Sequence, residues 1–329
     1  MNTYVKYKKY HMKIVALDGY AANPGDLSWD EMKTLGECTV YDRTAPSELL
    51  ERAKEADILL TNKVVITGEH MAALPRLKYI GVMATGYNIV DTAAAKERGI
   101  IVTNIPAYST DSVAQMVFAH LLNIAQQVQH HSEEVHKGRW TNSPDFCFWD
   151  TPLIELAGKK IGIVGLGNTG MRTARIAISF GMEVHAYTSK SHFQLPPEIK
   201  KMELDELFAE CDIVSLHIPA NAQTKESINY ALLSRMKKGA ILVNTARKEV
   251  INEADLKKVL EEREDLKYYS DLKVSDHEGF VGTFGMRYFA PPKKMGAQTS
   301  EANINAGIAA ARQIEAFLKT GDTTFQVNK

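Results

Sequence analysis

One segment limits the possible folds of this chain more than any other. Residues 161–170 read IGIVGLGNTG, an apolar strand-like run followed by spaced glycines and the start of a helical pattern. In such a turn Gly165 permits a tight reversal, Gly167 lets the backbone approach a pyrophosphate, and Gly170 allows a helix to pack closely on the strand. A helix N-terminus at this place attracts the anion, so the segment predicts a dinucleotide-binding unit rather than a purely structural glycine turn. The cofactor-binding residues predicted from this segment are Gly165, Gly167, Asn168, Thr169 and Gly170.

Short β-rich runs alternate with helical stretches along most of the chain. They are KIVALD, CTVYD, DILLTN, LKYIGV and IIVTN before the glycine turn, and EVHAY, DIVSLHIP, GAILVNTA and KYYSD after it. This rhythm is typical of parallel βα units, and the predicted fold class is α/β with two doubly wound parallel-sheet domains. A last helix is expected from about Ser300 to Lys319, ended by Gly321. One long helix is expected over 111–138, with Val113, Met116, Val117, Leu121, Ile124 and Val128 on one face.

Composition excludes several classes of protein. The 329 residues exceed the size of one typical core, and 39 basic against 40 acidic side chains give no charge signature for nucleic acid or anionic membrane. No run of about 18 apolar residues predicts a membrane span. Three cysteines without C-x-x-C spacing indicate a reducing compartment, and we expect a cytoplasmic protein with small-molecule partners. Residues 1–11 precede Met12 and the first strand-like run, and are interpreted as a leader outside the fold.

The strand EVHAY is not followed by the acidic residue that would bind the ribose hydroxyls of NAD. Thr188, Ser189 and Lys190 stand there instead. Two hydroxyls and an ammonium tolerate or favour a 2′-phosphate, so the cofactor is predicted to be NAD or NADP.

The motifs VGLGNTG, CDIVSLHIP, VNTAR and GAQTSEA resemble the D-isomer-specific 2-hydroxyacid dehydrogenase family, and the resemblance runs from Met12 to the end of the chain. It implies a flavodoxin-like substrate domain of residues 12–111 plus 303–329, a Rossmann NAD(P)-binding domain of residues 112–302, and an active site in a cleft between them. It also implies hydride transfer between the nicotinamide and a small D-2-hydroxy acid, and a homodimer that forms through residues 145–152. Further cofactor contacts implied by the resemblance are His217, Pro219, Thr224, Thr245 and Asp271.

Two basic residues match the catalytic positions of the family. Arg247 matches the arginine that holds the carboxylate and carbonyl of the 2-oxo acid, and a guanidinium suits this because its planar fork binds two oxygens. Lys294 stands where the family has a histidine as acid and base. Its ammonium can donate a proton if its pKa is lowered by burial or by a neighbouring cation such as Lys293. The alternative is a solvated lysine pair in an inactive or reassigned site.

The acidic partner of the proton donor is predicted from the segment SDLKVSDHEG. Asp276 falls where the resemblance counts the catalytic glutamate, and Glu278 is the alternative. His277 is expected to be solvated rather than catalytic.

Substrate contacts are predicted at two strand ends of the first domain. The loop over 82–91 resembles the family loop whose backbone amides bind the substrate carboxylate, with Ala84, Thr85 and Gly86 as candidates. Alternatively, Gly86 only turns the chain. Asn62 and Lys63, which end the run DILLTN, are weaker candidates.

A histidine group predicts no metal site. His130, His131 and His136 are interleaved with polar residues, and no carboxylate is expected to converge on them at ligand spacing.

Two subfamilies are similar to different parts of the chain. Residues 12–216 resemble glycerate dehydrogenases, also called hydroxypyruvate reductases, whereas residues 217–329 resemble lysine-type D-3-phosphoglycerate dehydrogenases, so a chimera or one mixed lineage is implied. The preferred substrates are hydroxypyruvate, D-glycerate or glyoxylate. The alternatives are D-3-phosphoglycerate oxidation in serine synthesis and a weakly catalytic, nucleotide-sensing binding protein.

Overall fold

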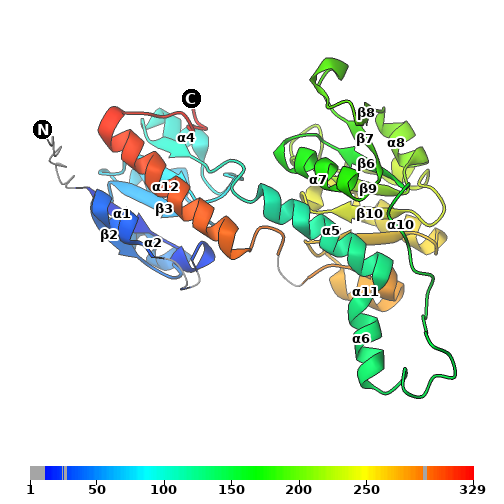
Figure 1. Ribbon diagram of the computed structural model, residues 1–329. Coiled ribbons are helices and arrows are strands. Elements are labelled where there is room, and N and C mark those ends of the chain that lie inside the picture. Colours follow the sequence, from blue (N-terminus) through cyan, green and yellow to red (C-terminus); the bar gives the residue numbers. More distant parts are fainter. Residues whose placement is uncertain (1–11, 24, 26–27, 292–294) are drawn as a thin grey trace, which may run out of the picture. The chain divides into compact units, whose positions relative to one another are not determined.

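The chain folds into two compact units in the computed structural model, which describes residues 12–23, 25, 28–291 and 295–329 (Figure 1). One unit comprises Met1–Ser109 with Thr299–Lys329, and the other comprises Thr110–Gln298. The boundaries expected from the sequence, at 111 and 303, lie two and four residues from 109 and 299.

The first unit is built on a five-stranded parallel sheet with the strand order β2-β1-β3-β4-β5. This is the flavodoxin-like order, in which the chain reverses direction across the sheet between β1 and β3. The strands are β1 Lys13–Ala16, β2 Glu37–Val40, β3 Ile58–Thr61, β4 Tyr79–Val82 and β5 Ile101–Thr103. The helices are α1 Asp30–Leu35, α2 Leu49–Ala53, α3 Gly68–Ala72, α4 Thr92–Glu97 and α12 Ser300–Thr320, with short 3-10 turns at Gly19–Ala21 and Pro46–Glu48.

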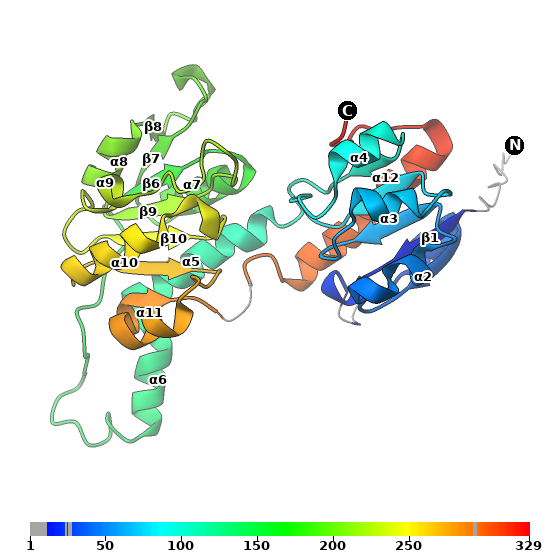
Figure 2. The same ribbon diagram turned by 180° about the vertical axis from the view of Figure 1, so that it is seen from behind.

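Helices cover both faces of this sheet, which explains why the central strands β3 and β4 are buried along their whole length. Alternate strand residues such as Ile14 and Leu60 pack under α1 and α12 on one face (Figure 1). Their neighbours Val15 and Leu59 pack under α2, α3 and α4 on the other face (Figure 2). The predicted last helix is confirmed, and it ends at Gly321 in the left-handed conformation.

The second unit is built on a seven-stranded parallel sheet with the order β12-β11-β10-β9-β6-β7-β8. Its strands are β6 Lys160–Val164, β7 Glu183–Tyr187, β8 Ile199–Lys201, β9 Ile213–Leu216, β10 Ile241–Asn244, β11 Lys267–Ser270 and β12 Tyr288–Phe289. Its helices are α5 Thr110–Gln126, α6 Val128–His136, α7 Asn168–Ser179, α8 Leu204–Glu210, α9 Tyr230–Leu233, α10 Glu253–Glu262 and α11 His277–Phe284, with 3-10 turns at His192–Gln194, Lys248–Val250 and Gly285–Arg287.

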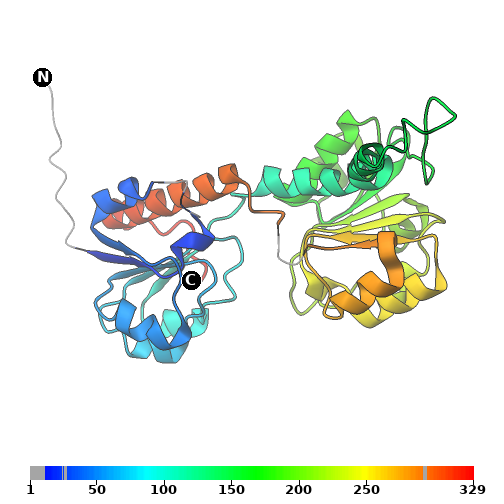
Figure 3. The same ribbon diagram turned by 90° about the horizontal axis from the view of Figure 1, so that it is seen from below.

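Each unit has three layers, with a sheet between two layers of helices (Figure 3). In the second unit α5 and α7 cover one face, and α8, α9, α10 and α11 cover the other. The predicted fold class is confirmed. The short strands β8 and β12 are absent from the predicted pattern because two or three residues carry too weak a signal.

The prediction of one helix over residues 111–138 is wrong, because the structure has two helices there. The helix is interrupted at Gln127, whose φ of 46° and ψ of 42° lie in the left-handed region. The carbonyl of Ala125 accepts a hydrogen bond from Ile154 N at 3.0 Å, and Gln127 Nε2 donates to Thr151 Oγ1 at 2.5 Å. The returning segment therefore binds the end of α5 in place of the next helical turn, and Val128 is exposed rather than on the buried face.

Among the described residues, no helix has the length and apolar character needed to cross a membrane.

His120, on α5, is a buried polar side chain that the sequence pattern did not single out. It is 4% exposed and lies edge-on to Tyr269 and Phe289, with ring centroids 6.0 and 5.6 Å away. In the described part of the chain its Nε2 has no hydrogen-bond partner. Burial lowers the pKa of His120 from 6.5 to about 4, because charging the ring there costs solvation energy.

This shift predicts a pH-dependent stability. The unfolded chain binds the proton more tightly, so the stability contribution of neutral His120 is full above pH 6.5 and is lost as the pH falls toward 4. When the pH falls from 7 to 5, the free energy of unfolding of the wild type should drop by about 2 kcal/mol more than that of His120→Leu, because leucine takes up no proton. Urea denaturation at both pH values measures this difference. His192→Leu, at an exposed position, is the control, and equal pH slopes for wild type and His120→Leu would contradict the prediction.

Candidate active site

The glycine turn lies between β6 and α7, at the carboxyl edge of the second sheet. The strand order reverses here between β6 and β9, which is where doubly wound sheets bind ligands. Gly165 N donates to Tyr187 O, and His217 N donates to Val164 O. The turn is therefore attached to the ends of β7 and β9.

A different steric condition favours glycine at each of the three positions. Gly165 has a φ of +95°, and a Cβ there would lie 2.8 Å from His217 O. A Cβ on Gly170 would lie 2.1 Å from Gly165 O, so only glycine lets α7 come this close to the turn. A Cβ on Gly167 would have no heavy atom of the described chain within 4 Å. Its place is open toward a ligand.

The turn fits the pyrophosphate of a dinucleotide. Gly167 is the N-cap of α7, and no side chain caps the helix there. The first N–H groups of the helix, from Asn168 and Thr169 on, are thus left to an anion. Thr245, which follows β10 on the same sheet edge, is buried, and its hydroxyl has no hydrogen-bond partner within the described ranges. An orphaned hydroxyl of this kind fits a polar group of a bound cofactor.

The end of β7 presents hydroxyls and ammonium groups. Thr188 and Lys190 are half-buried and Ser189 is exposed, and Lys190 N donates to Thr188 Oγ1 at 3.2 Å. Lys201, on the neighbouring strand β8, donates from Nζ to Lys190 O at 2.9 Å. Lys201 is thus a second ammonium at this edge, and the sequence pattern had not indicated it.

The loop after β9 is a self-contained turn. The Thr224 hydroxyl donates to Pro219 O at 2.5 Å and accepts from Asn221 N at 2.9 Å, so it shapes the loop. Burial lowers the pKa of His217 to about 4, and its Nε2 lies 2.9 Å from Ser215 Oγ.

Arg247 follows β10 and is held in an extended conformation by Asn244. The Asn244 side chain is fully buried, donates to Arg247 O at 3.0 Å and accepts from Ala246 N at 3.0 Å. The guanidinium donates to Ala246 O, and no carboxylate of the described residues forms an ion pair with it. Arg247 therefore has its charge available for a carboxylate ligand.

Asp271, at the end of β11, is fully buried and accepts a hydrogen bond from Gly296 N at 3.1 Å. A Cβ on Gly296 would lie 2.3 Å from that carboxylate, so the segment GAQT is attached to β11 through a glycine. Lys293 and Lys294 lie outside the described residues, and the role predicted for Lys294 stays a prediction.

Asp276 is the N-cap of α11. It accepts from Gly279 N at 3.2 Å and pairs with Lys257 at 3.2 Å, and its side chain is exposed. Glu278 is also exposed, in the first turn of the same helix. These contacts give Asp276 a structural role, and its catalytic role stays a prediction.

Two expectations about histidines are wrong. His277 is not simply solvated, because its Nδ1 lies 3.0 Å from the hydroxyl of Tyr288 and its ring lies edge-on to that tyrosine. A carboxylate does converge on His130, whose Nε2 lies 2.5 Å from Asp150 Oδ2. Arg139 and His130 hold the pKa of Asp150 well below its usual range.

The other two histidines contact carbonyls of their own helix. His131 and His136 each lie within hydrogen-bond distance of the carbonyl four residues earlier. No group of three metal-ligating side chains occurs in the part of the chain that the structure describes.

In the first unit, the loop after β4 has free backbone donors. Among the described residues, the N–H groups of Ala84, Thr85 and Gly86 donate no hydrogen bond. The loop is nevertheless fixed, because Ile105 N donates to Ala84 O and Asn104 Nδ2 donates to Thr85 O at 2.7 Å. Successive free N–H groups on a fixed loop form a concavity that suits a carboxylate.

The turn after β3 lies beside this loop on the same sheet edge. Asn62 is buried and donates from Nδ2 to Met83 O at 2.8 Å, whereas the side chain of Lys63 is exposed. Their backbone N–H groups donate to Asp18, a buried carboxylate at the end of β1. Asp18 is not among the residues predicted from the sequence, although its place directly after a strand was a usable signal.

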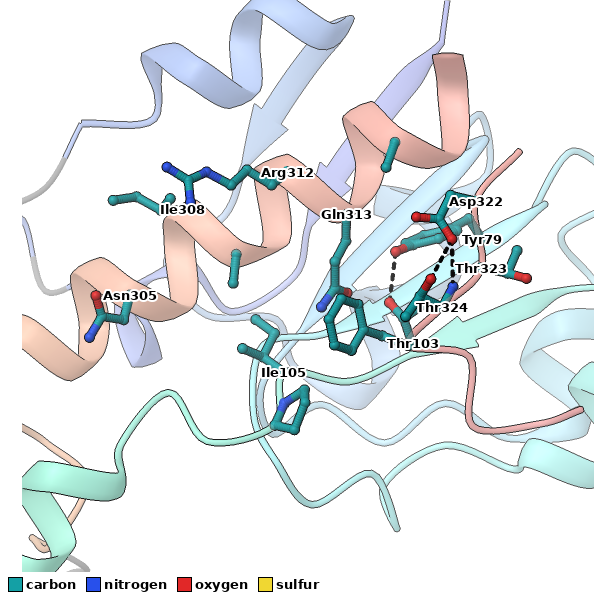
Figure 4. A pocket seen from close by; sticks show the side chains of 14 residues that line it. Tyr79, Thr103, Ile105, Asn305, Ile308, Arg312, Gln313, Asp322, Thr323 and Thr324 are labelled. Carbon is teal, nitrogen blue, oxygen red and sulfur yellow. Dashed lines mark hydrogen bonds between the residues drawn. The ribbon is translucent and has the colours of Figure 1, made fainter. Parts of the chain in front are cut away.

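The first unit also has a cavity of about 330 Å³ (Figure 4). It lies between α12, the end of β5 and residues 322–325, and Ile308 and Ala316 form part of its apolar wall. Gln313 points from α12 toward the end of β5 (Figure 4). Its Nε2 donates a hydrogen bond to Asn104 O at 3.0 Å. Because Asn104 also binds Thr85, α12 supports the loop of free donors.

Comparisons with known proteins identify the relatives of this chain. A model of the D-isomer specific 2-hydroxyacid dehydrogenase, NAD binding domain, matches residues 118–280. A hydroxypyruvate reductase of Blautia hydrogenotrophica is 47% identical over 249 residues, 74% of this chain and 77% of that protein. A D-3-phosphoglycerate dehydrogenase of Haemophilus influenzae is 33% identical, over 85% of this chain and 68% of that protein. The crystal structure of NAD+-bound 3-phosphoglycerate dehydrogenase from Entamoeba histolytica has a TM-score of 0.80 and 32% identity, covering 97% of this chain and 99% of that chain.

The fold and the glycine turn thus define an NAD-dependent oxidoreductase. The chain belongs to the D-isomer-specific 2-hydroxyacid dehydrogenase family, whose reaction acts on a CH–OH group. The family predicted from the sequence motifs is confirmed.

The glycine geometry predicts two separable defects. Gly167→Ala should leave the melting temperature unchanged, because its methyl group has no heavy atom of the described chain within 4 Å, and should weaken NADH binding about tenfold or more, or about 1.4 kcal/mol. Gly170→Ala should lower stability by about 1–3 kcal/mol, because the clash is with backbone. Thermal unfolding and NADH fluorescence titration measure both effects.

Gly307→Ala is the matched control, since a Cβ there also has no neighbour within 4 Å among the residues that the structure describes, and the residue lies in the other unit. Its NADH affinity should equal that of the wild type. Unchanged NADH affinity in Gly167→Ala would show that the open space beside this glycine does not receive the cofactor.

Proposed function

We propose that this protein catalyses the reversible reduction of hydroxypyruvate to D-glycerate with NADH. The observation that carries the proposal is Arg247, held rigidly by Asn244 at the carboxyl edge of the cofactor-binding sheet, with no carboxylate partner among the described residues. A guanidinium so placed can bind the carboxylate and carbonyl oxygens of a 2-oxo acid together. The 47% identity to a protein named hydroxypyruvate reductase supports the choice of substrate.

Each residue group has a distinct task in the proposed reaction. When bound, the nicotinamide cofactor supplies the hydride that the carbonyl carbon accepts. Arg247 polarises the carbonyl, and the free N–H groups of Ala84, Thr85 and Gly86 bind the substrate carboxylate. Lys294 donates the proton that the developing alkoxide requires, which balances the reduction of C=O to CH–OH. Asp276 remains the predicted acidic partner, and its contacts with Gly279 and Lys257 must then be exchanged for others.

We propose that the protein also accepts NADPH. Thr188, Ser189 and Lys190 offer hydroxyls and an ammonium where NAD-specific sheets carry an acid. Lys201 adds a second ammonium to the same edge. A 2′-phosphate would therefore meet positive charge rather than a carboxylate.

A steady-state panel of 2-oxo acids tests the proposed substrate. We expect hydroxypyruvate to have a kcat/KM at least about tenfold above those of pyruvate and phosphohydroxypyruvate, or about 1.4 kcal/mol. A phosphate ester needs a cationic pocket beyond Arg247. Glyoxylate is included as a smaller substrate, and each acid is assayed with NADH and with NADPH.

Arg247→Ala is the test variant of this panel. Because the guanidinium is proposed to bind substrate and polarise its carbonyl, KM should rise and kcat should fall together. Lys248→Ala, at the exposed neighbouring position, is the matched control and should behave as the wild type. Faster turnover of phosphohydroxypyruvate would favour the phosphoglycerate alternative, and NADH binding without turnover would favour a nucleotide-sensing protein.

We propose that the active form is a homodimer that forms through the α6 surface. We use this name for the exposed apolar side chains on α6 and the segment after it: Val128, Val135, Trp140, Phe146, Trp149 and Leu153. Phe146 is 92% and Trp149 60% exposed. Aromatic side chains are enriched at protein interfaces, and we expect the dimer in the cytoplasm.

Sedimentation analysis tests the homodimer. Phe146→Ser combined with Trp149→Ser should convert the dimer into monomer or weaken it at least about a hundredfold, because aromatic side chains carry much of the binding energy at interfaces. Phe193→Ser is the matched control, since Phe193 is fully exposed in the same unit but outside the α6 surface. A wild-type protein that sediments as a monomer at micromolar concentration would refute the proposal.

A further inference from the structure

Asp18 is a buried acid with an unusual set of partners. It is 6% exposed at the end of β1, and its carboxylate accepts three consecutive backbone N–H groups from the turn after β3. The donors are Asn62 N at 2.8 Å, Lys63 N at 2.5 Å and Val64 N at 3.1 Å. Three such donors form an anion-binding concavity, and here the protein fills it with its own carboxylate.

The position of Asp18 follows from the sheet topology. Strands β1 and β3 are parallel neighbours in which Ala16 pairs with Leu60, so Asp18 comes level with Asn62 two residues further on. Between these two strands the order of the sheet reverses, and this is where doubly wound sheets receive ligands. Asp18 therefore occupies the place that a ligand anion would otherwise take.

The contacts of Asp18 extend to the loop with free donors. Asn62 donates from its side chain to Met83 O, directly before Ala84. The turn is also closed by the Thr61 hydroxyl, which donates to Val64 O at 3.0 Å. On one sheet edge, the concavity of residues 62–64 is thus filled, whereas the N–H groups of residues 84–86 donate to nothing in the described part of the chain.

We propose that Asp18 is a positioning residue for substrate binding, an inference that rests on the proposed function. By filling the first concavity it directs the substrate carboxylate to residues 84–86, and through Asn62 it fixes the start of that loop. It also fixes the backbone of Lys63, whose exposed side chain stands at the same edge. A small misplacement of such groups costs substrate affinity without touching the cofactor.

Kinetics of Asp18→Asn and Asp18→Ala test this role. The asparagine retains the size of the side chain but presents an NH2 group to backbone donors, and we expect KM for hydroxypyruvate to rise about tenfold, with kcat within about threefold. The KM for NADH should stay unchanged because the cofactor site belongs to the other unit. Asp18→Ala should show a larger rise in KM for hydroxypyruvate.

Asp57→Ala is the matched control for a purely structural effect. Asp57 is equally buried, accepts Lys13 N at 3.0 Å and pairs with Arg76, but it precedes β3 and so lies at the opposite edge of the same sheet. The substitution Asp57→Ala should lower thermal stability and leave KM for hydroxypyruvate within about twofold of the wild-type value. An equal rise of KM in Asp57→Ala, or an unchanged KM in both Asp18 variants, would overturn the proposal.

Formate supplies a second readout that does not depend on turnover. In Asp18→Ala a formate ion can enter the emptied concavity, so formate should raise the melting temperature of this variant more than that of the wild type or Asp57→Ala. Chloride at equal ionic strength should not raise the melting temperature in this way. Formate should also lower the raised KM of Asp18→Ala for hydroxypyruvate. If the wild type reduces no 2-oxo acid, the proposed function fails. A formate response confined to Asp18→Ala would still support the inference that Asp18 fills the concavity of residues 62–64. If formate has no such effect on Asp18→Ala, that inference is overturned.

Discussion

Neighbouring strands pair in parallel in both sheets of this protein. In a parallel sheet every strand ends at the same edge, so residues far apart in the sequence gather there without any contact between their own segments. Gly165, His217, Thr245 and Asp271 each follow a strand of the second sheet by one residue. The cofactor contacts expected from separate motifs therefore lie along one edge.

The first sheet shows how backbone donors at such an edge can be given different uses. Asp18 occupies the donors of residues 62–64, and the donors of residues 84–86 remain open. Parallel strand ends would otherwise offer a small anion two similar places. The buried side chain of Asp18, which accepts hydrogen bonds from three backbone N–H groups, removes one of these two places.

The errors of prediction arose where a distant segment competes with local structure. The helical periodicity over 111–138 was sound locally, but Ile154 binds the carbonyl of Ala125 and the helix breaks at Gln127. Asp150, which lies on the same returning segment, pairs with His130. Tyr288, eleven residues after His277 and on the strand β12, lies within hydrogen-bond distance of that histidine. No local pattern contains these partners, because each depends on where the chain returns.

Local patterns in the sequence are enough to predict the fold class and the glycine turn, because strand periodicity and steric freedom at glycine are properties of short segments. The family followed from the resemblance of several motifs, and the role of Arg247 stays a prediction that rests on that resemblance. Three pairings become visible only in the folded chain: Asp18 fills one concavity, Asn244 holds the backbone of Arg247, and Lys201 contacts Lys190. Those pairings arise from strand register and from the order of strands in each sheet. The same register that places Asp18 beside Asn62 is set by the packing of both sheet faces, which no single motif encodes.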